Sequence, residues 1–256
     1  MVTLKQAFGI RKREVVSLVG GGGKTTLMYA LGRELAESRN GVLLTTTTKI
    51  WEPEPAPFFL SFISEDLPEI KKWVIENIPR RMCLLVARQR LASGKLDGMP
   101  PAWIDEIFSL ERVSAIINEA DGAAGRPLKA PRENEPVIPE STTLLVPVMG
   151  IEGVDQPLDE KTVFRSAMAS RLLGMPAGGR VTEDAVVRLM WEGIRGRPHG
   201  ARVIPLINKV DIADGMKKAR TMARCILSSD PSKIRSVVLG QLRHSSSVHV
   251  VKKRKG

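Results

Sequence analysis

The sequence predicts an α/β fold built on a mostly parallel, doubly wound sheet. Short apolar runs of strand length alternate with amphipathic stretches of helix length along most of the chain. Parallel strands that are covered by helices on both faces are apolar throughout, and these runs have that character. The 256 residues, 43% of them hydrophobic, suffice to bury a core of that size.

Apolar runs bounded by turn residues predict the strands, and amphipathic stretches between them predict the helices. The expected strands are residues 15–19, 42–46, 82–87, 113–118, 143–148, 203–207 and 234–239. The expected helices are residues 24–38, 67–78, 101–109, 160–173, 183–194 and 213–227. Most helices fall between two strands, which is the order expected of parallel neighbours.

Proline-rich and polar segments interrupt this pattern. The segments "EPEPAP" (52–57) and "ASGKLDGMPP" (92–101) predict an insertion at about residues 51–111. A loop at residues 121–140 is polar and rich in proline, and loops of that length inside a compact domain tend to be functional or disordered. We expect one domain over residues 1–245, followed by a basic, flexible tail at 246–256.

The composition restricts the class of partner. A net charge of +11 favours anionic partners, but no stacking aromatics or reading helix support nucleic acid. Cys83 and Cys225 lack the spacing of a disulfide framework or a zinc site. The N-terminal stretch lacks the apolar segment of a secretion signal, and no run approaches the ~18 apolar residues of a membrane span. We therefore expect a cytoplasmic protein that does not bind membranes.

Four glycines stand between the first predicted strand and the first long helix, in "VGGGGKTT" (19–26). Glycine lets a backbone wrap closely around an anion, and the start of the helix adds its positive dipole end. Lys24 would then reach the β- and γ-phosphates, and the Thr25 hydroxyl would ligate Mg²⁺. The residues expected to bind the nucleotide here are Gly20, Gly21, Gly22, Gly23, Lys24, Thr25 and Thr26.

The glycine segment is a shortened variant of the phosphate-binding loop. The strict pattern GxxxxGK[ST] requires glycine at position 18, where Leu18 stands. The strand before the segment and the helix after it supply the context of a P-loop, so the fold class expected is of P-loop NTPase type. The alternative is a flexible turn that caps a helix.

A second motif indicates the base of the nucleotide. The strand at 203–207 is followed by Asn208, Lys209 and Asp211 in an NKxD arrangement. The Asp211 carboxylate can accept hydrogen bonds from N1–H and the 2-amino group of guanine, neither of which adenine has. This interpretation favours GTP over ATP as the purine nucleotide, and an ordinary surface turn is the alternative.

Two acidic residues end the strand at 113–118. Glu119 and Asp121 are two positions apart, so both could face the same site. Magnesium on the β- and γ-phosphates requires carboxylate or water oxygens. We expect Asp121 on the metal side and Glu119 as a base that positions water, with Lys24 completing the catalytic set.

Other cations lie in the loops around this site. Lys49 follows "LLTTTT", and Arg126 and Lys129 lie in the long loop, so the three could bind a second anion near the γ-phosphate. The alternative is that they are solvated loop residues.

Five segments resemble a known family when they are taken together: "SLVGGGGKTTLMYALGREL", "LLTTTTKI", "NEADGAAGRPLKAPRENEPVIP", "VMGIEGVDQPL" and "PLINKVD". In this order, from about residue 7 to 240, they resemble the selenium-dependent hydroxylase accessory protein family, YqeC. The resemblance implies a P-loop protein that acts in maturation of selenium-dependent molybdenum hydroxylases. Its partner would be such a hydroxylase or a protein that handles the selenium or molybdenum cofactor.

One segment departs from the family's pattern. In "VFRSAMASRLLG" (163–174), Phe164 and Ser166 stand where more polar residues are expected, which leaves the role of Arg165 open.

The function expected is a GTP-binding, GTP-hydrolysing accessory factor that uses Mg²⁺. The alternative is an ATP-dependent ligase or kinase, because the shortened glycine loop followed by Lys-Thr-Thr also resembles that of Mur-type ligases. In that case Arg126 and Lys129 would bind the acceptor substrate.

Overall fold

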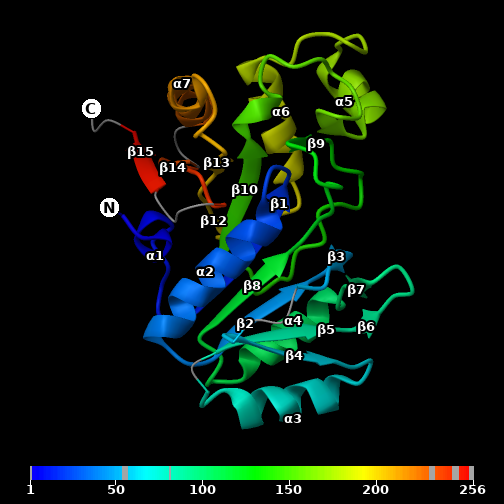
Figure 1. Ribbon diagram of the computed structural model, residues 1–256, viewed down its shortest axis with the longest axis vertical. Coiled ribbons are helices and arrows are strands. Elements are labelled where there is room, and N and C mark those ends of the chain that lie inside the picture. The colour runs from blue at the N-terminus through cyan, green and yellow to red at the C-terminus, as the bar shows by residue number, and fades with distance from the viewer. Residues whose placement is uncertain (1, 54–56, 81, 231–233, 244–247, 254–256) are drawn as a thin grey trace.

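The computed structural model describes residues 2–53, 57–80, 82–230, 234–243 and 248–253 (Figure 1). Among them, ten strands form one central sheet. These strands are β1 (Glu14–Gly20), β2 (Val42–Thr46), β4 (Phe59–Ile63), β5 (Cys83–Ala87), β8 (Ala115–Glu119), β10 (Leu144–Gly150), β12 (Arg202–Val203), β13 (Leu206–Asn208), β14 (Ser236–Gly240) and β15 (Val248–Lys252).

The sheet is parallel except at one edge. Its strands follow the order β15-β14-β13-β10-β1-β8-β2-β5-β4, and β12 also pairs with β10. Among the described strand pairs of this sheet, only β14 and β15 are antiparallel. The predicted α/β fold with a mostly parallel sheet is therefore confirmed.

Helices cover both faces of this sheet, which explains why its strands are apolar throughout. On one face, α1 and α2 pack against Val16 and Leu18 of β1. On the other face, α3 and α4 pack around Val15, and α6 and α7 pack with the cluster that contains Val19. The helices are α1 (Leu4–Ala7), α2 (Lys24–Ser38), α3 (Leu67–Asn77), α4 (Pro101–Ser109), α5 (Ser166–Leu173), α6 (Glu183–Gly193) and α7 (Gly215–Ser229).

The predicted insertion at 51–111 is largely part of the main sheet. Within it, β4, α3 and β5 form a strand, a helix and the next strand, so this half of the segment extends the sheet at its edge. Only the small sheet of β3 (Ile50–Trp51), β7 (Lys95–Asp97) and β6 (Gln89–Arg90) stands apart. The prolines that suggested an insertion lie in the connections of these elements.

The predicted flexible tail contains a strand. β15 pairs with β14 over its whole length, and Val248 is buried against the core. The sequence pattern missed it because polar residues precede it and His249 interrupts the valines. Residues 254–256 of the predicted tail lie outside the described part of the chain.

Helix α5 begins at Ser166 instead of at the predicted residue 160. Val163–Phe164 forms β11, which pairs with β9 (Leu128–Lys129) in a separate two-stranded sheet. The polar loop at 121–140 is thereby fixed to the segment before α5. Within the described residues, no helix has both the length and the apolarity needed to cross a lipid bilayer.

Candidate functional site

The glycine segment connects the end of β1 to the start of α2 at the carboxyl edge of the sheet, where ligands of open α/β sheets bind. Gly20, Gly22 and Gly23 have φ angles of +90°, +73° and +125°, which L side chains rarely adopt. A Cβ on Gly22 would lie 2.2 Å from the backbone nitrogen of Gly150 at the end of β10. Glycine is required here by backbone angle and by close packing.

The amides of the first three glycines are bonded within the protein. Gly20 donates to Asp121 Oδ2 at 3.0 Å, Gly21 to the Val148 carbonyl at 2.9 Å and Gly22 to the Arg126 carbonyl at 2.9 Å. Three of the residues expected to bind the nucleotide therefore have amides that are already paired, because β10 and the 121–127 loop supply their acceptors.

The next four amides are different. Those of Gly23 to Thr26 donate to no acceptor within the described ranges, and no side chain caps the start of α2. Unpaired amides in the first turn of a helix are the groups that bind phosphate in many proteins. The amides of the segment that remain available to a ligand are therefore those of residues 23–26.

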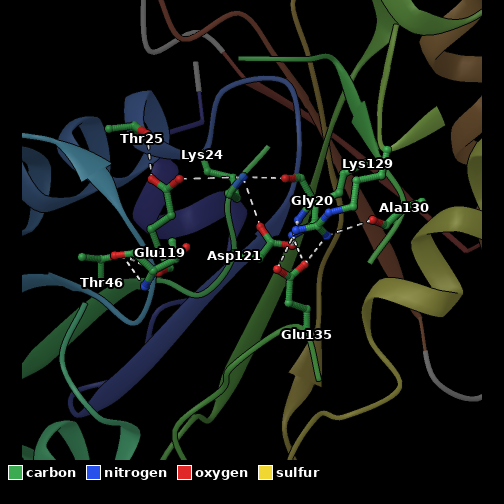
Figure 2. Close-up of polar contacts among 11 residues, drawn as sticks. Gly20, Lys24, Thr25, Thr46, Glu119, Asp121, Lys129, Ala130 and Glu135 are labelled. Atoms are coloured by element: carbon green, nitrogen blue, oxygen red, sulfur yellow. Dashed lines mark hydrogen bonds and ion pairs between the residues drawn. The ribbon is translucent and has the colours of Figure 1, made fainter. Parts of the chain in front are cut away.

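Lys24 is buried between Glu119, the last residue of β8, and Asp121, just beyond it (Figure 2). Its Nζ lies 3.1 Å from Asp121 Oδ1 and 3.7 Å from Glu119 Oε1, and it donates to the Gly20 carbonyl. Burial by itself would lower the pKa of Lys24, but Asp121 and Glu119 raise it above its ordinary value. The lysine is therefore fully charged and held at the base of the glycine segment.

Glu119 lies next to Thr25, whereas Asp121 does not. The Thr25 hydroxyl donates to Glu119 Oε2 at 2.6 Å. Burial raises the pKa of Glu119, with Lys24 and Thr25 acting in the opposite direction. Asp121 instead accepts from the Gly20 amide and pairs with two lysines, so its oxygens are occupied within the protein.

Lys129 is also buried and unavailable to a second anion. Its Nζ lies 3.1 Å from Asp121 Oδ2 and 2.7 Å from Glu135 Oε2 (Figure 2). Arg165 donates to both carboxylate oxygens of Glu135 in a two-pronged ion pair. The result is a continuous chain of charges from Lys24 through Asp121, Lys129 and Glu135 to Arg165. Sequence reasoning missed Glu135 and left Arg165 open, because nothing in the local pattern brings residues 30 positions apart together.

This chain of charges predicts a pH dependence of stability. Burial by itself would raise the pKa of Glu135, but Arg165 and Lys129 outweigh it and lower the pKa to about 2. Because the folded pKa is below the unfolded value, the stabilisation is present above roughly pH 4.3 and is lost as the pH falls toward 2. Its size is on the order of 3 kcal/mol.

Glu135→Gln is therefore expected to lower the free energy of unfolding at pH 7 by about that amount, with a difference from wild type that narrows below pH 4. Urea unfolding between pH 2.5 and 7 measures it. Glu133→Gln, at an exposed neighbour, is the control and should change little. A difference that stays constant with pH would contradict the assignment.

The NKxD residues reach the glycine segment from β13. Asn208 is buried, and its Nδ2 donates to the Gly22 carbonyl at 2.8 Å across 186 positions of sequence. Lys209, at φ +63°, pairs with Glu152, and Asp211 is exposed just beyond the strand. The two motifs, which lie far apart in the sequence, are thus in direct contact.

A cleft of about 340 Å³ opens beside the start of α2, on the side away from β13. Lys49 and Arg126, two of the three cations predicted to bind a second anion, line it, and Lys129 does not. Sequence analysis missed two other lining residues, Trp51 and Lys95, which belong to the small sheet. The lining includes Gly22, Gly23, Lys24, Thr25, Thr26, Lys49, Trp51, Lys95, Glu119 and Arg126.

Comparison with known proteins shows to which family the chain belongs. The sequence pattern described as "YqeC protein" matches residues 16–167, more than half of the chain. The chain belongs to the YqeC family. It is 32% identical over 205 residues to "Uncharacterized protein YqeC" of Escherichia coli (strain K12), which covers 78% of this chain and 78% of that YqeC protein. The family pattern includes the glycine segment, Glu119, Asp121 and Glu135 and ends before Asn208.

Proposed function

We propose that this YqeC protein binds and hydrolyses a magnesium nucleoside triphosphate, with GTP preferred, at the glycine segment. The hydrogen bond from Asn208 to the Gly22 carbonyl carries the proposal. It connects the predicted base-reading motif to the predicted phosphate loop, although the two are formed by distant parts of the chain.

The phosphates are bound by the four amides of Gly23 to Thr26 and by Lys24. The positive end of α2 adds to the attraction of an anion there. The Lys24 ammonium pairs with Asp121 and Glu119, and nucleotide binding would exchange some of these carboxylate oxygens for phosphate oxygens. Lys129 remains beside Asp121 and keeps that buried carboxylate neutralised.

The residues fit Mg²⁺ once the nucleotide supplies further oxygens. Thr25 and Glu119 offer a hydroxyl and a carboxylate, and magnesium is commonly bound by one or two carboxylates together with phosphate and water. The described residues contain no group of three or more His, Cys, Asp or Glu that could hold a metal by themselves. The geometry favours Glu119, in place of the expected Asp121, as the residue on the metal side.

Hydrolysis requires positioning and charge stabilisation more than covalent chemistry. Lys24 and the amides of 23–26 are the donors available to the developing charge. Bound Mg²⁺ would supply further neutralisation between the β- and γ-phosphates. Asp121 contributes indirectly, because it holds Lys24 and the Gly20 amide in place.

Guanine is assigned to the β13 side of the glycine segment. Asp211 is exposed at that edge and can accept from guanine N1–H and the 2-amino group, while the stem of Lys209 covers the ring. We further propose, from the sequence resemblance, that the nucleotide state controls a step in maturation of selenium-dependent molybdenum hydroxylases. The partner would be the hydroxylase or a protein that handles its cofactor.

A second candidate function is an ATP-dependent ligase or kinase. The cleft that Lys49, Lys95 and Arg126 line beside the phosphate loop favours it, because such enzymes hold an acceptor next to the γ-phosphate. Base preference and stimulation of turnover by an acceptor distinguish the two functions.

The test is calorimetric titration of the purified protein with GTP, GDP, ATP and ADP, each with Mg²⁺. The proposal predicts saturable binding, at least tenfold tighter for guanine than for adenine nucleotides, and slow release of phosphate from GTP. Tighter binding of ATP than of GTP would support the ligase or kinase, and indifference to all four nucleotides would refute both functions.

A further inference from the structure

The cleft beside α2 is lined by more side chains that can bind a ligand than a triphosphate would contact. Trp51, at its rim, is 63% exposed, more than any other large hydrophobic side chain in the described part of the chain. Exposing so much indole to water is unfavourable, so a stacking partner for this ring is the use to look for.

The backbone of Trp51 is held by the small sheet. Ile50, its neighbour in β3, is buried and pairs with Leu96, which turns Trp51 to the outside. The amide of Met99, beyond β7, donates to the Thr46 carbonyl at 2.8 Å, which fixes the small sheet to the end of β2. A pre-positioned aromatic ring loses little freedom when a ligand binds.

Cations line the cleft beside this ring. The Lys95 Nζ lies 4.9 Å from the centre of the indole ring, and Lys49 and Arg126 line the same cleft. Neither Lys49 nor Lys95 forms an ion pair with a carboxylate of the described residues. Glu52, an acid next to Trp51, is occupied by Arg90 in a two-pronged pair. The rim therefore offers positive charge and one aromatic face.

The cleft lies on the opposite side of β1 from Asn208 and the proposed guanine site. Asn208 ends β13, which lies two strands from β1 on one side, and Lys49 and Trp51 follow β2, which lies two strands from β1 on the other. A nucleotide whose base lies toward β13 would leave the β2 side open next to its terminal phosphate.

We propose that this rim binds a second ligand together with the nucleotide: a small, planar heteroaromatic compound that carries a phosphate or carboxylate group. Its ring stacks on Trp51, and its acid group is held by Lys49 and Lys95, with Arg126 nearby. The position of this second ligand next to the terminal phosphate rests on the proposed function. The choice of residues that form its site does not. A cleft of about 340 Å³ with one aromatic wall and several cations has the size of a small-molecule site.

The test uses flavin mononucleotide as the probe, because it combines a planar heteroaromatic ring with a phosphate. The full-length protein is saturated with Mg-GDP, and quenching of the flavin fluorescence is followed on titration. The expected result is saturable binding that does not displace GDP. Riboflavin, which lacks the phosphate, and inorganic phosphate, which lacks the ring, should each bind at least roughly tenfold more weakly.

Variants then place the site. Trp51→Ala and Lys49→Ala are each expected to weaken flavin mononucleotide binding by roughly tenfold or more. Lys72→Ala, at an exposed lysine of α3, is the matched control and should bind as wild type does. Far-ultraviolet circular dichroism and urea unfolding confirm that the variants are folded, which the exposure of both side chains leads us to expect.

Three results would overturn the second site: no saturable binding of the probe, binding that Trp51→Ala leaves unchanged, or displacement of the probe by GTP in direct competition. Failure of the proposed function can be distinguished from failure of the second site, because the titration with flavin mononucleotide is also made without nucleotide. If GTP does not bind, and the probe binds to wild type but not to Trp51→Ala, the second site is supported and the proposed function is refuted.

Discussion

Lys24→Ala is expected to lower the affinity for Mg-GTP by about 10- to 100-fold, since hydrogen bonds to charged groups contribute roughly 1.5–3 kcal/mol. It is also expected to destabilise the nucleotide-free protein. Glu119 and Asp121 are buried, and removing the cation between them leaves charge without its partner. Breaking a buried ion pair in this way costs about 3–5 kcal/mol, and Lys129 beside Asp121 places the expected loss at the lower end.

Calorimetry measures the affinity and urea unfolding at pH 7 measures the stability. The stability difference between Lys24→Ala and wild type should narrow at acid pH, where Glu119, whose pKa burial raises, takes up a proton. Lys72→Ala, on the exposed face of α3, controls for loss of one positive charge. A folded Lys24→Ala variant that binds Mg-GTP as tightly as wild type would exclude Lys24 from phosphate binding.

Asp211→Asn is expected to change which base the protein prefers. An asparagine can accept one hydrogen bond from guanine but cannot accept from the 2-amino group, so the affinity for GTP should fall by about 100-fold. Xanthine carries an oxygen at the same position, which the asparagine amide can donate to. The affinity for xanthosine triphosphate should therefore rise in this variant, with little change for ATP.

The same four-nucleotide titration, extended to xanthosine triphosphate, makes this measurement. Asp211 is exposed, so the variant should retain the stability of wild type. Asp184→Asn, at an exposed aspartate in the first turn of α6, is the matched control. If Asp211→Asn and wild type show the same order of preference among the nucleotides, Asp211 does not contact the base.

The fold was predictable because hydrophobic periodicity and turn residues are local signals. Helix α2 occurs over the residues predicted, 24–38, since a glycine run precedes it and its buried leucines recur at helical spacing. The signals were weakest at the sheet edges. In β4 the polar Ser61 interrupts the apolar residues and none of them is fully buried, and β15 follows a polar segment, so neither has the unbroken apolar run of a central strand.

The site could be predicted only where its residues are close together in the sequence. The glycine segment and the NKxD residues could be read from sequence, but the contact between Asn208 and Gly22 depends on the neighbouring positions of β1, β10 and β13. The burial of Lys129 depends on Glu135 and Arg165, which lie on other segments. Trp51 could not be distinguished from a core residue, because its exposure follows from the pairing of β3 with β7.

The most direct test of the phosphate site is residue-resolved nuclear magnetic resonance of the backbone amides during titration with Mg-GDP and, separately, with guanosine. We predict large shifts of the amides of Gly23, Lys24, Thr25 and Thr26 with GDP and small ones with guanosine, which has no phosphate. The amides of Gly20 and Gly21 should shift least, because they already donate to Asp121 and Val148. Unchanged amides at 23–26 under saturating nucleotide would contradict the account.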